Sequence, residues 1–295
     1  MRVEPLAEAE ADQQISADAP VHRVSTLSVL RVEMAKLSRQ GRTWVGLGTA
    51  AIAPVALVVA MSLPATALPK DSPFGRYVRD TGLAGPLVLL GFGGLWFLPM
   101  LAAIVTGDLF SCEDHHGTWK TYLTRSASRN QIFTAKVLAG TLYTVGLVVL
   151  MTVIGIVASI ARFGAGPLVD LSGAAIGPGR ALPLILASWT LSLLPLLAFA
   201  FLAMACSLIS RNGIVGVVTP IVLSFLMQLA GFLNLGGSTA RHYLLTTQFE
   251  AFHGLFHQPA YPGMVWRAVL VSILYAIPTL ATAYLVFRRR DITGG

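Results

Sequence analysis

Long apolar runs limit the folds open to this chain more than any other feature of its sequence. Six runs reach about 20 residues or more, the length that an α-helix needs to cross the roughly 30 Å hydrocarbon core of a bilayer. They lie at residues 44–63, 82–106, 131–161, 181–209, 214–235 and 264–287. Charged residues make up only 12% of the chain, about half their share in soluble domains. The sequence therefore predicts an all-α polytopic membrane protein, with a six-helix transmembrane domain over residues 44–290.

Two segments of different character precede the first run. Residues 1–24 are acidic and poor in large apolar side chains, so we expect a disordered tail there. Residues 25–43 carry apolar residues at three- and four-residue steps, namely Leu27, Leu30, Met34 and Leu37. Their charged residues fall mainly on other sides of such a helix: Arg31, Glu33, Lys36 and Arg39. The pattern predicts an amphipathic helix at the membrane interface; a simple extension of the first span is the alternative.

The lysines and arginines predict an orientation. With the N-terminus inside, about thirteen of them fall on the inner side and about seven on the outer side, and cytoplasmic segments normally hold the larger share. We therefore expect a multi-pass protein of the plasma (inner) membrane with both termini in the cytoplasm. The net charge of +7 follows from the same bias and does not indicate a nucleic-acid partner.

A polar island over residues 107–136 separates the second and third runs, and it holds the candidate functional residues. It is too short for a folded domain and too charged for lipid, so we expect a connection at the membrane surface. Its core is the run Cys112, Glu113, Asp114, His115 and His116. Such residues often bind metals, but neighbours on one helix point about 100° apart. They cannot converge on one ion, and no metal site is predicted.

The spacing of the island resembles that of permease subunits of ABC-2-type transporters. In that family a Glu lies four residues before a Gly-Thr pair, and a Ser-Arg pair and a Lys at the start of the next membrane helix follow. The corresponding residues here are Glu113, Gly117, Thr118, Ser128, Arg129 and Lys136. The chain departs from the family pattern in the Cys112–His116 run and at Ala127, where a Pro is usual.

The resemblance implies a coupling role for the island. In the family, the segment between spans two and three docks in a groove of a separate ATPase subunit, and here that segment covers residues 108–130. The implied coupling residues are Glu113, Gly117, Thr118, Arg125, Arg129 and Lys136. The basic residues among them would pair with acidic groups of the ATPase or with anionic lipid headgroups. For Arg125 and Arg129, holding the loop on the inner side is an equal alternative.

The resemblance also implies an assembly. Two permease chains, expected as a homodimer in the lipid bilayer, would work with two ATPase chains and export an amphipathic or lipophilic substrate such as a drug, an antibiotic or a lipid. The N-terminal amphipathic helix would help to form the surface that meets the ATPase. The aromatic residues within 238–262 would belong to a lid of short external helices, although an interfacial anchor explains them equally well.

Missing motifs agree with this assignment. The chain contains no G-x-x-x-x-G-K-[ST] phosphate loop, the motif that cradles nucleotide phosphates. We therefore expect a transport subunit that is not an enzyme and binds no cofactor, with ATP and Mg on the partner ATPase. No ionisable residue lies at the predicted mid-bilayer depth, which argues against an ion-coupled carrier. A non-enzymatic membrane scaffold or sensor needs no sequence signature and is the alternative function.

Overall fold

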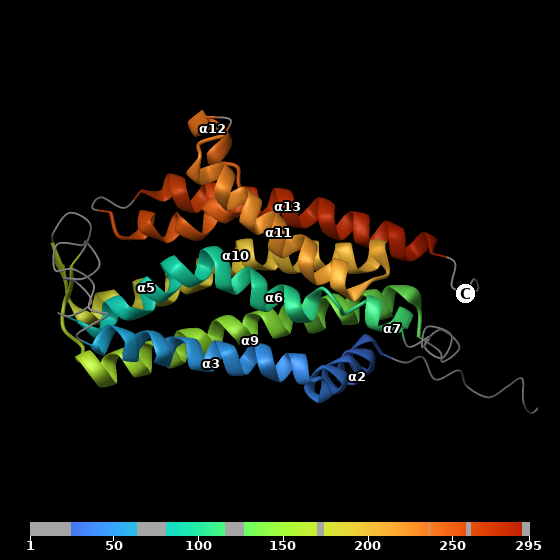
Figure 1. Ribbon diagram of the computed structural model, residues 1–295, viewed down its shortest axis with the longest axis horizontal. Helices are drawn as coiled ribbons and strands as arrows, with labels where there is room; N and C mark the ends of the chain where they lie inside the picture. Colours follow the sequence, from blue (N-terminus) through green and yellow to red (C-terminus); the bar gives the residue numbers. More distant parts are fainter. Residues whose placement is uncertain are drawn as a thin grey trace, which may run out of the picture.

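Six helices form the membrane-spanning body of the protein. The computed structural model describes residues 25–63, 81–115, 127–169, 174–235, 237–257 and 261–290. In this part of the chain, six helices are long and apolar enough to cross a membrane, and they run along the long axis of the molecule (Figure 1). The predicted all-α, multi-pass membrane protein is confirmed. The expected tail over residues 1–24 lies outside the described residues.

Five of the spans are single long helices. They are α3 (Gly41–Ser62), α9 (Arg129–Phe163), α10 (Pro178–Ser210), α11 (Gly213–Phe232) and α13 (Pro262–Arg289). α9 has 35 residues and α10 has 33, well above the roughly 20 that the hydrocarbon core requires. These two helices therefore tilt or extend beyond the hydrocarbon.

The second span, Gly82–His115, is a chain of shorter helices. In order they are η2 (Gly82–Ala84, 3-10), α5 (Gly85–Phe92), η3 (Gly93–Phe97, π), α6 (Leu98–Thr106) and α7 (Ser111–His115). Pro99 has no N–H to donate, and its ring crowds the carbonyl group of Leu95. A regular α-helical turn is therefore disfavoured where η3 lies.

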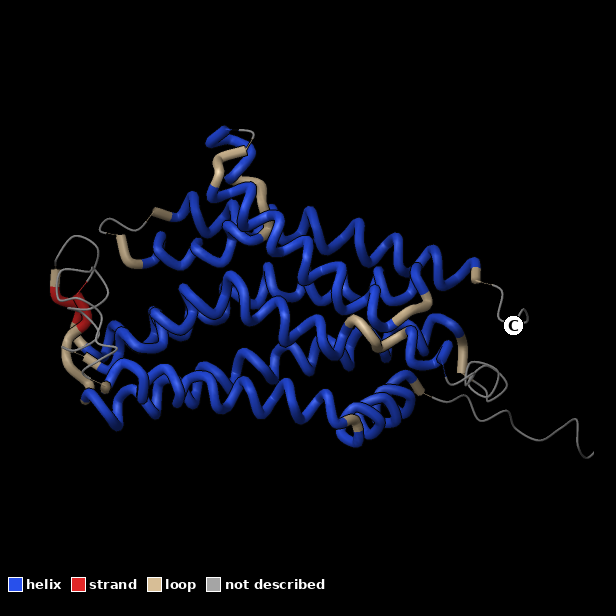
Figure 2. The backbone as a smooth tube through the Cα atoms, viewed as in Figure 1, coloured by secondary structure: helices blue, strands red, loops and turns tan. Residues whose placement is uncertain are grey.

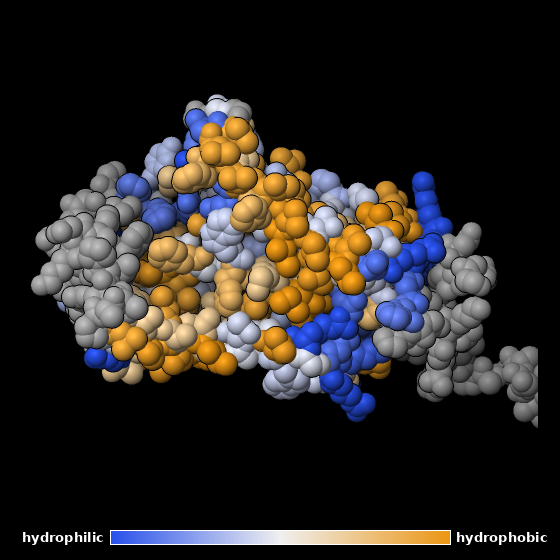
Figure 3. All heavy atoms as spheres, in the orientation of Figure 1, coloured by the Kyte–Doolittle hydropathy of each residue, from blue (hydrophilic) through white to orange (hydrophobic). Residues whose placement is uncertain are grey.

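The two ends of the bundle differ. The strands β1 (Leu168–Val169) and β2 (Ala175–Ile176) pair antiparallel between α9 and α10, and Figure 2 shows them in red. The helix α2 (Thr26–Arg39) lies at the opposite end, near α7 (Figure 1). We call these the hairpin end and the α2 end. Apolar residues cover much of the side of the bundle, and hydrophilic residues gather at the α2 end (Figure 3).

The N-terminal helix α2 packs on the protein along a side that includes only part of its predicted apolar face. Two residues of its predicted apolar face stay exposed, Leu27 at 56% and Met34 at 36%. The buried residues of α2 are Val29, Glu33 and Leu37, which share one side because four residues make about one helical turn. The sequence placed Glu33 among charged residues that lie mainly off the apolar face, and in the structure its side chain faces the protein interior.

A sharp corner joins α2 to α3. Ser25 caps the start of α2, since its hydroxyl accepts a hydrogen bond from the backbone N–H of Ser28 at 3.2 Å. Gln40 adopts an extended conformation and ends the helix. The indole Nε1 of Trp44 then donates back across the corner to the carbonyl oxygen of Ser38 at 2.7 Å. The corner fixes α2 at an angle to the first span (Figure 1).

The connection between α11 and α13 turns back into the protein. The short helix α12 (Gly237–Arg241) projects from the side of the bundle (Figure 1). The 3-10 helix η4 (Thr246–Leu255) follows and packs against α10 and α13.

Aromatic side chains hold η4 in place. Phe249, Phe252 and Phe256 are each at most 5% exposed, and the ring of Phe249 stacks on Phe199 of α10 with centroids 6.3 Å apart. The sequence offered an interfacial anchor as one explanation of these rings. That explanation is wrong for these three, because they are packed inside the protein. The expected lid function of the segment stays a prediction.

Candidate functional site

The described part of the polar island lies at the α2 end, where several elements meet. α6 ends at Thr106, residues 107–110 form a turn, and α7 follows. We call residues 107–115 the α6–α7 turn. It carries three carboxylates, on Asp108, Glu113 and Asp114, and each forms an ion pair with a different part of the chain. These ion pairs make the turn the candidate functional site.

The ammonium group of Lys136 makes the most deeply buried of these contacts. Its Nζ donates to Oε2 of Glu33, to Oε1 of Glu113 and to the carbonyl oxygen of Leu109, each at 3.0 Å. The side chain of Lys136 is only 1% exposed. A lysine ammonium has three protons, and all three have partners here. The expected pairing of Lys136 with an ATPase or a lipid headgroup is therefore corrected, because its charge is satisfied inside the protein.

A second lysine completes the set. The Nζ of Lys36 donates to Oε1 of Glu113 at 2.7 Å and lies 3.7 Å from Oε1 of Glu33. Two carboxylates and two ammonium groups thus balance each other, and we call Glu33, Lys36, Glu113 and Lys136 the charge cluster. It ties α2, α7 and α9 together. Removing one partner from a buried ion pair costs about 3–5 kcal/mol, because the remaining charge is left uncompensated.

Asp108 connects the turn to α3 and, through Ser111, to α10. Its carboxylate forms an ion pair with Arg42 and accepts a hydrogen bond from the hydroxyl of Ser111 at 2.9 Å. The backbone N–H of Ser111 donates to the hydroxyl of Ser207 at 3.0 Å. The side chain of Asp108 and the backbone N–H of Ser111 thus have partners on α3, on α10 and within the turn, as buried polar groups require.

The end of α13 is fastened to the same region. Asp114 pairs with Arg290, the residue that follows α13. Nη1 of Arg129, at the start of α9, donates to the carbonyl oxygens of Arg288 at 3.0 Å and Arg290 at 2.7 Å. The last carbonyl groups of a helix lack partners within the helix, so Arg129 caps α13. The predicted coupling residue Arg129 is thus engaged within the protein through this nitrogen.

Glycines allow α11 to approach the turn closely. A Cβ on Gly216 would collide with the backbone of Gly107, and a Cβ on Gly107 would collide with the backbone of Gly216. A Cβ on Gly213 would meet the carboxylate of Asp108. The first turn of α11 and the α6–α7 turn therefore pack backbone to backbone, which only glycine permits at these positions.

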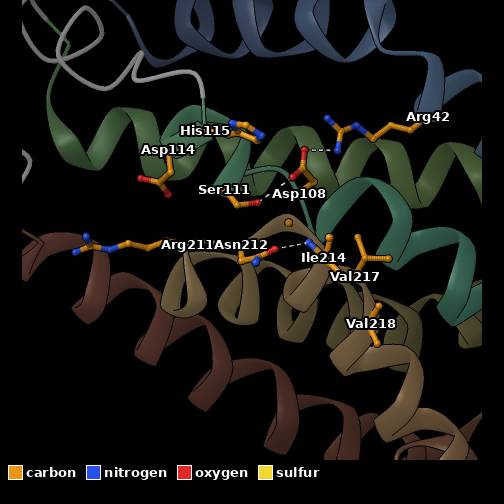
Figure 4. A pocket seen from close by; sticks show the side chains of 11 residues that line it. Arg42, Asp108, Ser111, Asp114, His115, Arg211, Asn212, Ile214, Val217 and Val218 are labelled. Atoms are coloured by element: carbon orange, nitrogen blue, oxygen red, sulfur yellow. Dashed lines mark hydrogen bonds and ion pairs between the residues drawn. The ribbon is translucent and has the colours of Figure 1, made fainter. Parts of the chain in front are cut away.

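A cleft of about 810 Å³ lies between α7 and the turn that joins α10 to α11 (Figure 4). Arg42 and Asp108 line one wall, and Arg211 and Asn212 line the other (Figure 4). Asn212 caps α11 by accepting a hydrogen bond from the backbone N–H of Ile214 at 2.9 Å. The walls carry charges of both signs, so the cleft suits a polar group or a segment of a partner more than a purely apolar ligand.

The structure places some of the predicted site residues and adds others. Glu113 and Lys136 meet in the charge cluster, whereas Arg129 binds the end of α13. Three further predicted residues lie outside the described residues: Gly117, Thr118 and Arg125. The coupling role of these last three residues stays a prediction. Sequence reasoning missed the partners that complete the site: Glu33, Lys36, Arg42, Asp108 and Arg290. A lysine inside an apolar run such as that of Lys136 needs a carboxylate partner, but the sequence does not say which one.

The metal-ligand types of the island do not assemble in the described residues. Within residues 25–63, 81–115 and the later described ranges, no three His, Cys, Asp or Glu side chains converge as metal ligands. The thiol of Cys112 contacts the carbonyl oxygen of Leu109 at 3.5 Å, and His116 lies outside the described residues.

One family matches most of the chain. A family model described as "Protein of unknown function (DUF2705)" matches residues 83–293. The chain belongs to this family. The DUF2705 match runs from the start of the second span to beyond the end of α13, so it includes Glu113 and Lys136, whereas Glu33 on α2 precedes it. A search of curated proteins gives no match to the chain.

Proposed function

We propose that this protein is the permease subunit of an ATP-driven exporter of the ABC-2 type, with the ATPase on a separate chain. Its six spans and the spacing around Glu113 support the proposal. The main support is the set of ion pairs that joins the α6–α7 turn to α2, α3, α9 and the residue after α13. A force applied to this turn by an ATPase would reach four other parts of the bundle.

The same contacts support a docking role for residues 116–126. This segment connects α7 to α9 and contains the proposed contact residues Gly117, Thr118 and Arg125. Glu113 lies just before it and Lys136 in the first turns of α9, and the two side chains are hydrogen-bonded to each other. In this proposal the charge cluster positions both ends of the docking segment, and the segment itself contacts the ATPase.

The proposed orientation places the α2 end in the cytoplasm of a cell whose plasma (inner) membrane holds the protein. Most described cations lie at that end: Arg31, Lys36, Arg39, Arg42, Arg129, Lys136, Arg211, Arg288, Arg289 and Arg290. Positive side chains accumulate on the cytoplasmic side of membrane proteins. Both chain termini then lie in the cytoplasm.

The proposed assembly is a homodimer of permeases with two ATPase chains, because one copy supplies one docking segment. A broad apolar surface is open to a second copy. On it Trp96, in η3, and Phe225, on α11, are 46% and 51% exposed, and their rings lie 5.3 Å apart. Such a surface also fits an amphipathic or lipophilic substrate, the class proposed for export.

Purification from the native membrane tests the proposal. The tagged full-length chain is solubilised in mild detergent, captured and assayed for co-purifying ATP hydrolysis. We expect an ATPase subunit in the eluate. Gly117→Val, in the proposed docking segment, should reduce the amount of that subunit or its activity. Gly91→Ala is the matched control, because no atom lies within 4 Å of a Cβ built at Gly91, and it should leave both unchanged.

The alternative function predicts a different result. A non-enzymatic scaffold or sensor would elute without an ATPase, or with one whose activity is indifferent to Gly117→Val. Either result, obtained with correctly inserted protein, would overturn the exporter proposal.

A further inference from the structure

The described carboxylates at the α2 end all form ion pairs within the protein. In the described part of that end, four acids pair with four bases: Glu33, Asp108, Glu113 and Asp114 with Lys36, Arg42, Lys136 and Arg290. These eight side chains cancel in charge. The remaining charge of the described α2 end therefore comes from arginines alone.

Several arginines at this end form no ion pair with any described residue. They are Arg31, Arg39, Arg211, Arg288 and Arg289, and all five are exposed. Arg31 and Arg39 lie on α2, the helix whose other face carries the charge cluster. On α2, Glu33 and Lys36 are engaged in the charge cluster, whereas Arg31 and Arg39 stay exposed. The outer surface of α2 is therefore positively charged.

The position of α2 brings that surface to the edge of the bilayer. α3 is a membrane span, and the hydrogen bond from Trp44 to Ser38 folds α2 back at its end. Trp44 is 62% exposed, and Leu27 and Met34 form an exposed apolar flank next to Arg31. Tryptophan side chains and amphipathic basic helices are enriched at the membrane interface, between the hydrocarbon core and the headgroups. Arginine stems lie along apolar surface while their guanidinium groups reach outward.

We propose that this corner binds the headgroups of anionic phospholipids. Its members are Leu27, Arg31, Met34, Arg39 and Trp44, and we call them the α2 corner. Guanidinium groups bind phosphate oxygens in a two-pronged geometry, and the apolar flank beside them accommodates the start of an acyl chain. A soluble phosphate would use only the arginines, so the surface fits a lipid. The proposal does not depend on the transport function.

Lipid selectivity of the reconstituted protein tests the proposal. The full-length chain is placed in bilayers of phosphatidylcholine and phosphatidylglycerol, and spin-labelled lipids report the preference of the protein for each headgroup. We expect the wild type to prefer phosphatidylglycerol, and Arg31→Gln with Arg39→Gln to reduce that preference by about two- to fivefold per arginine, since each basic residue near the surface attracts anionic lipid. Added salt should reduce the wild-type preference in the same direction.

The control removes the same charge from the other end of the molecule. Arg162→Gln with Arg180→Gln changes two exposed arginines near the hairpin end and should reduce the preference less. An equal reduction by both pairs would overturn the proposal in favour of a general charge effect. A wild type without preference would also overturn it.

Discussion

The α2 end and the region around η4 are each held together by contacts between elements distant in sequence, but the contacts differ in kind. At the α2 end, four charged side chains share one neutral cluster, and one lysine supplies hydrogen bonds to two helices and a carbonyl group. Around η4, aromatic rings fill the space between α10 and α13, as the stacking of Phe249 on Phe199 shows. Ion pairs depend on charge number and geometry, whereas ring packing depends on volume and shape.

This difference bears on how the two regions respond to change. A cluster of opposite charges is intolerant of losing one member and tolerant of losing a matched pair. An apolar contact is graded, because each lost atom removes a small amount of dispersion energy. If the α2 end transmits force, the all-or-none response of a charge cluster suits it, because a stiff and specific junction moves as one body.

The largest effect should come from Lys136→Met. The substitution leaves Glu33 and Glu113 with only Lys36, so one carboxylate is uncompensated in a buried site, and we expect a loss of about 3–5 kcal/mol of stability. Thermal unfolding of the purified protein in detergent measures it. The double variant Lys136→Met with Glu33→Gln restores neutrality around the Lys36–Glu113 pair and should recover most of the loss. Without such recovery, charge balance would not be what holds the α2 end.

A smaller effect should follow from Gly216→Ala, which tests shape at the α2 end. The new Cβ collides with the backbone of Gly107, and overpacking of this kind costs about 1–3 kcal/mol. The expected readouts are a lower unfolding temperature and faster proteolysis near the α10–α11 turn. Gly146→Ala on α9 is the matched control, because nothing lies within 4 Å of its Cβ. If both variants behaved alike, close backbone contact would be unimportant there.

The smallest effect should come from Phe249→Leu in η4. The substitution removes the ring that stacks on Phe199 but keeps an apolar side chain, so we expect a loss of about 1–2 kcal/mol, below the value of about 3–5 kcal/mol typical of Phe→Ala at a buried site. Comparing the unfolding temperatures of Phe249→Leu and Phe249→Ala measures the gradation. Equal losses would show that η4 depends on the aromatic ring itself and would remove the contrast with the α2 end.

The membrane spans were predictable because their signal is local. Each apolar run specifies its own helix, since the bilayer demands both length and hydropathy from every span. The second span shows how far this signal reaches. The apolar run predicts a span over residues 82–106, whereas the structure continues it through α7 to His115 and divides it into 3-10, π and α pieces that reflect Pro99.

The site was only half predictable because its contacts are long-range. Glu113 and Lys136 belong to one short polar segment, so local spacing could single them out. Glu33 lies 103 residues from Lys136 along the chain, and the apolar periodicity of α2 did not single it out as a buried residue. The same limit applies to Phe249, Phe252 and Phe256, since an interfacial anchor and a buried contact have the same composition.

The π-helix η3 sets the rotational phase of everything that follows it in the second span. A π-bulge is in effect one extra residue in an α-helix, and one residue corresponds to a rotation of about 100°. If the same residues were wound as a regular α-helix without the bulge, α6 and the carboxylates beyond it would be turned by roughly a quarter of a circle. Asp108, Glu113 and Asp114 would then point away from Arg42, Lys136 and Arg290. The π-helical turn within the second span thus determines the direction in which the carboxylates at the α2 end face, and so whether their ion pairs can form.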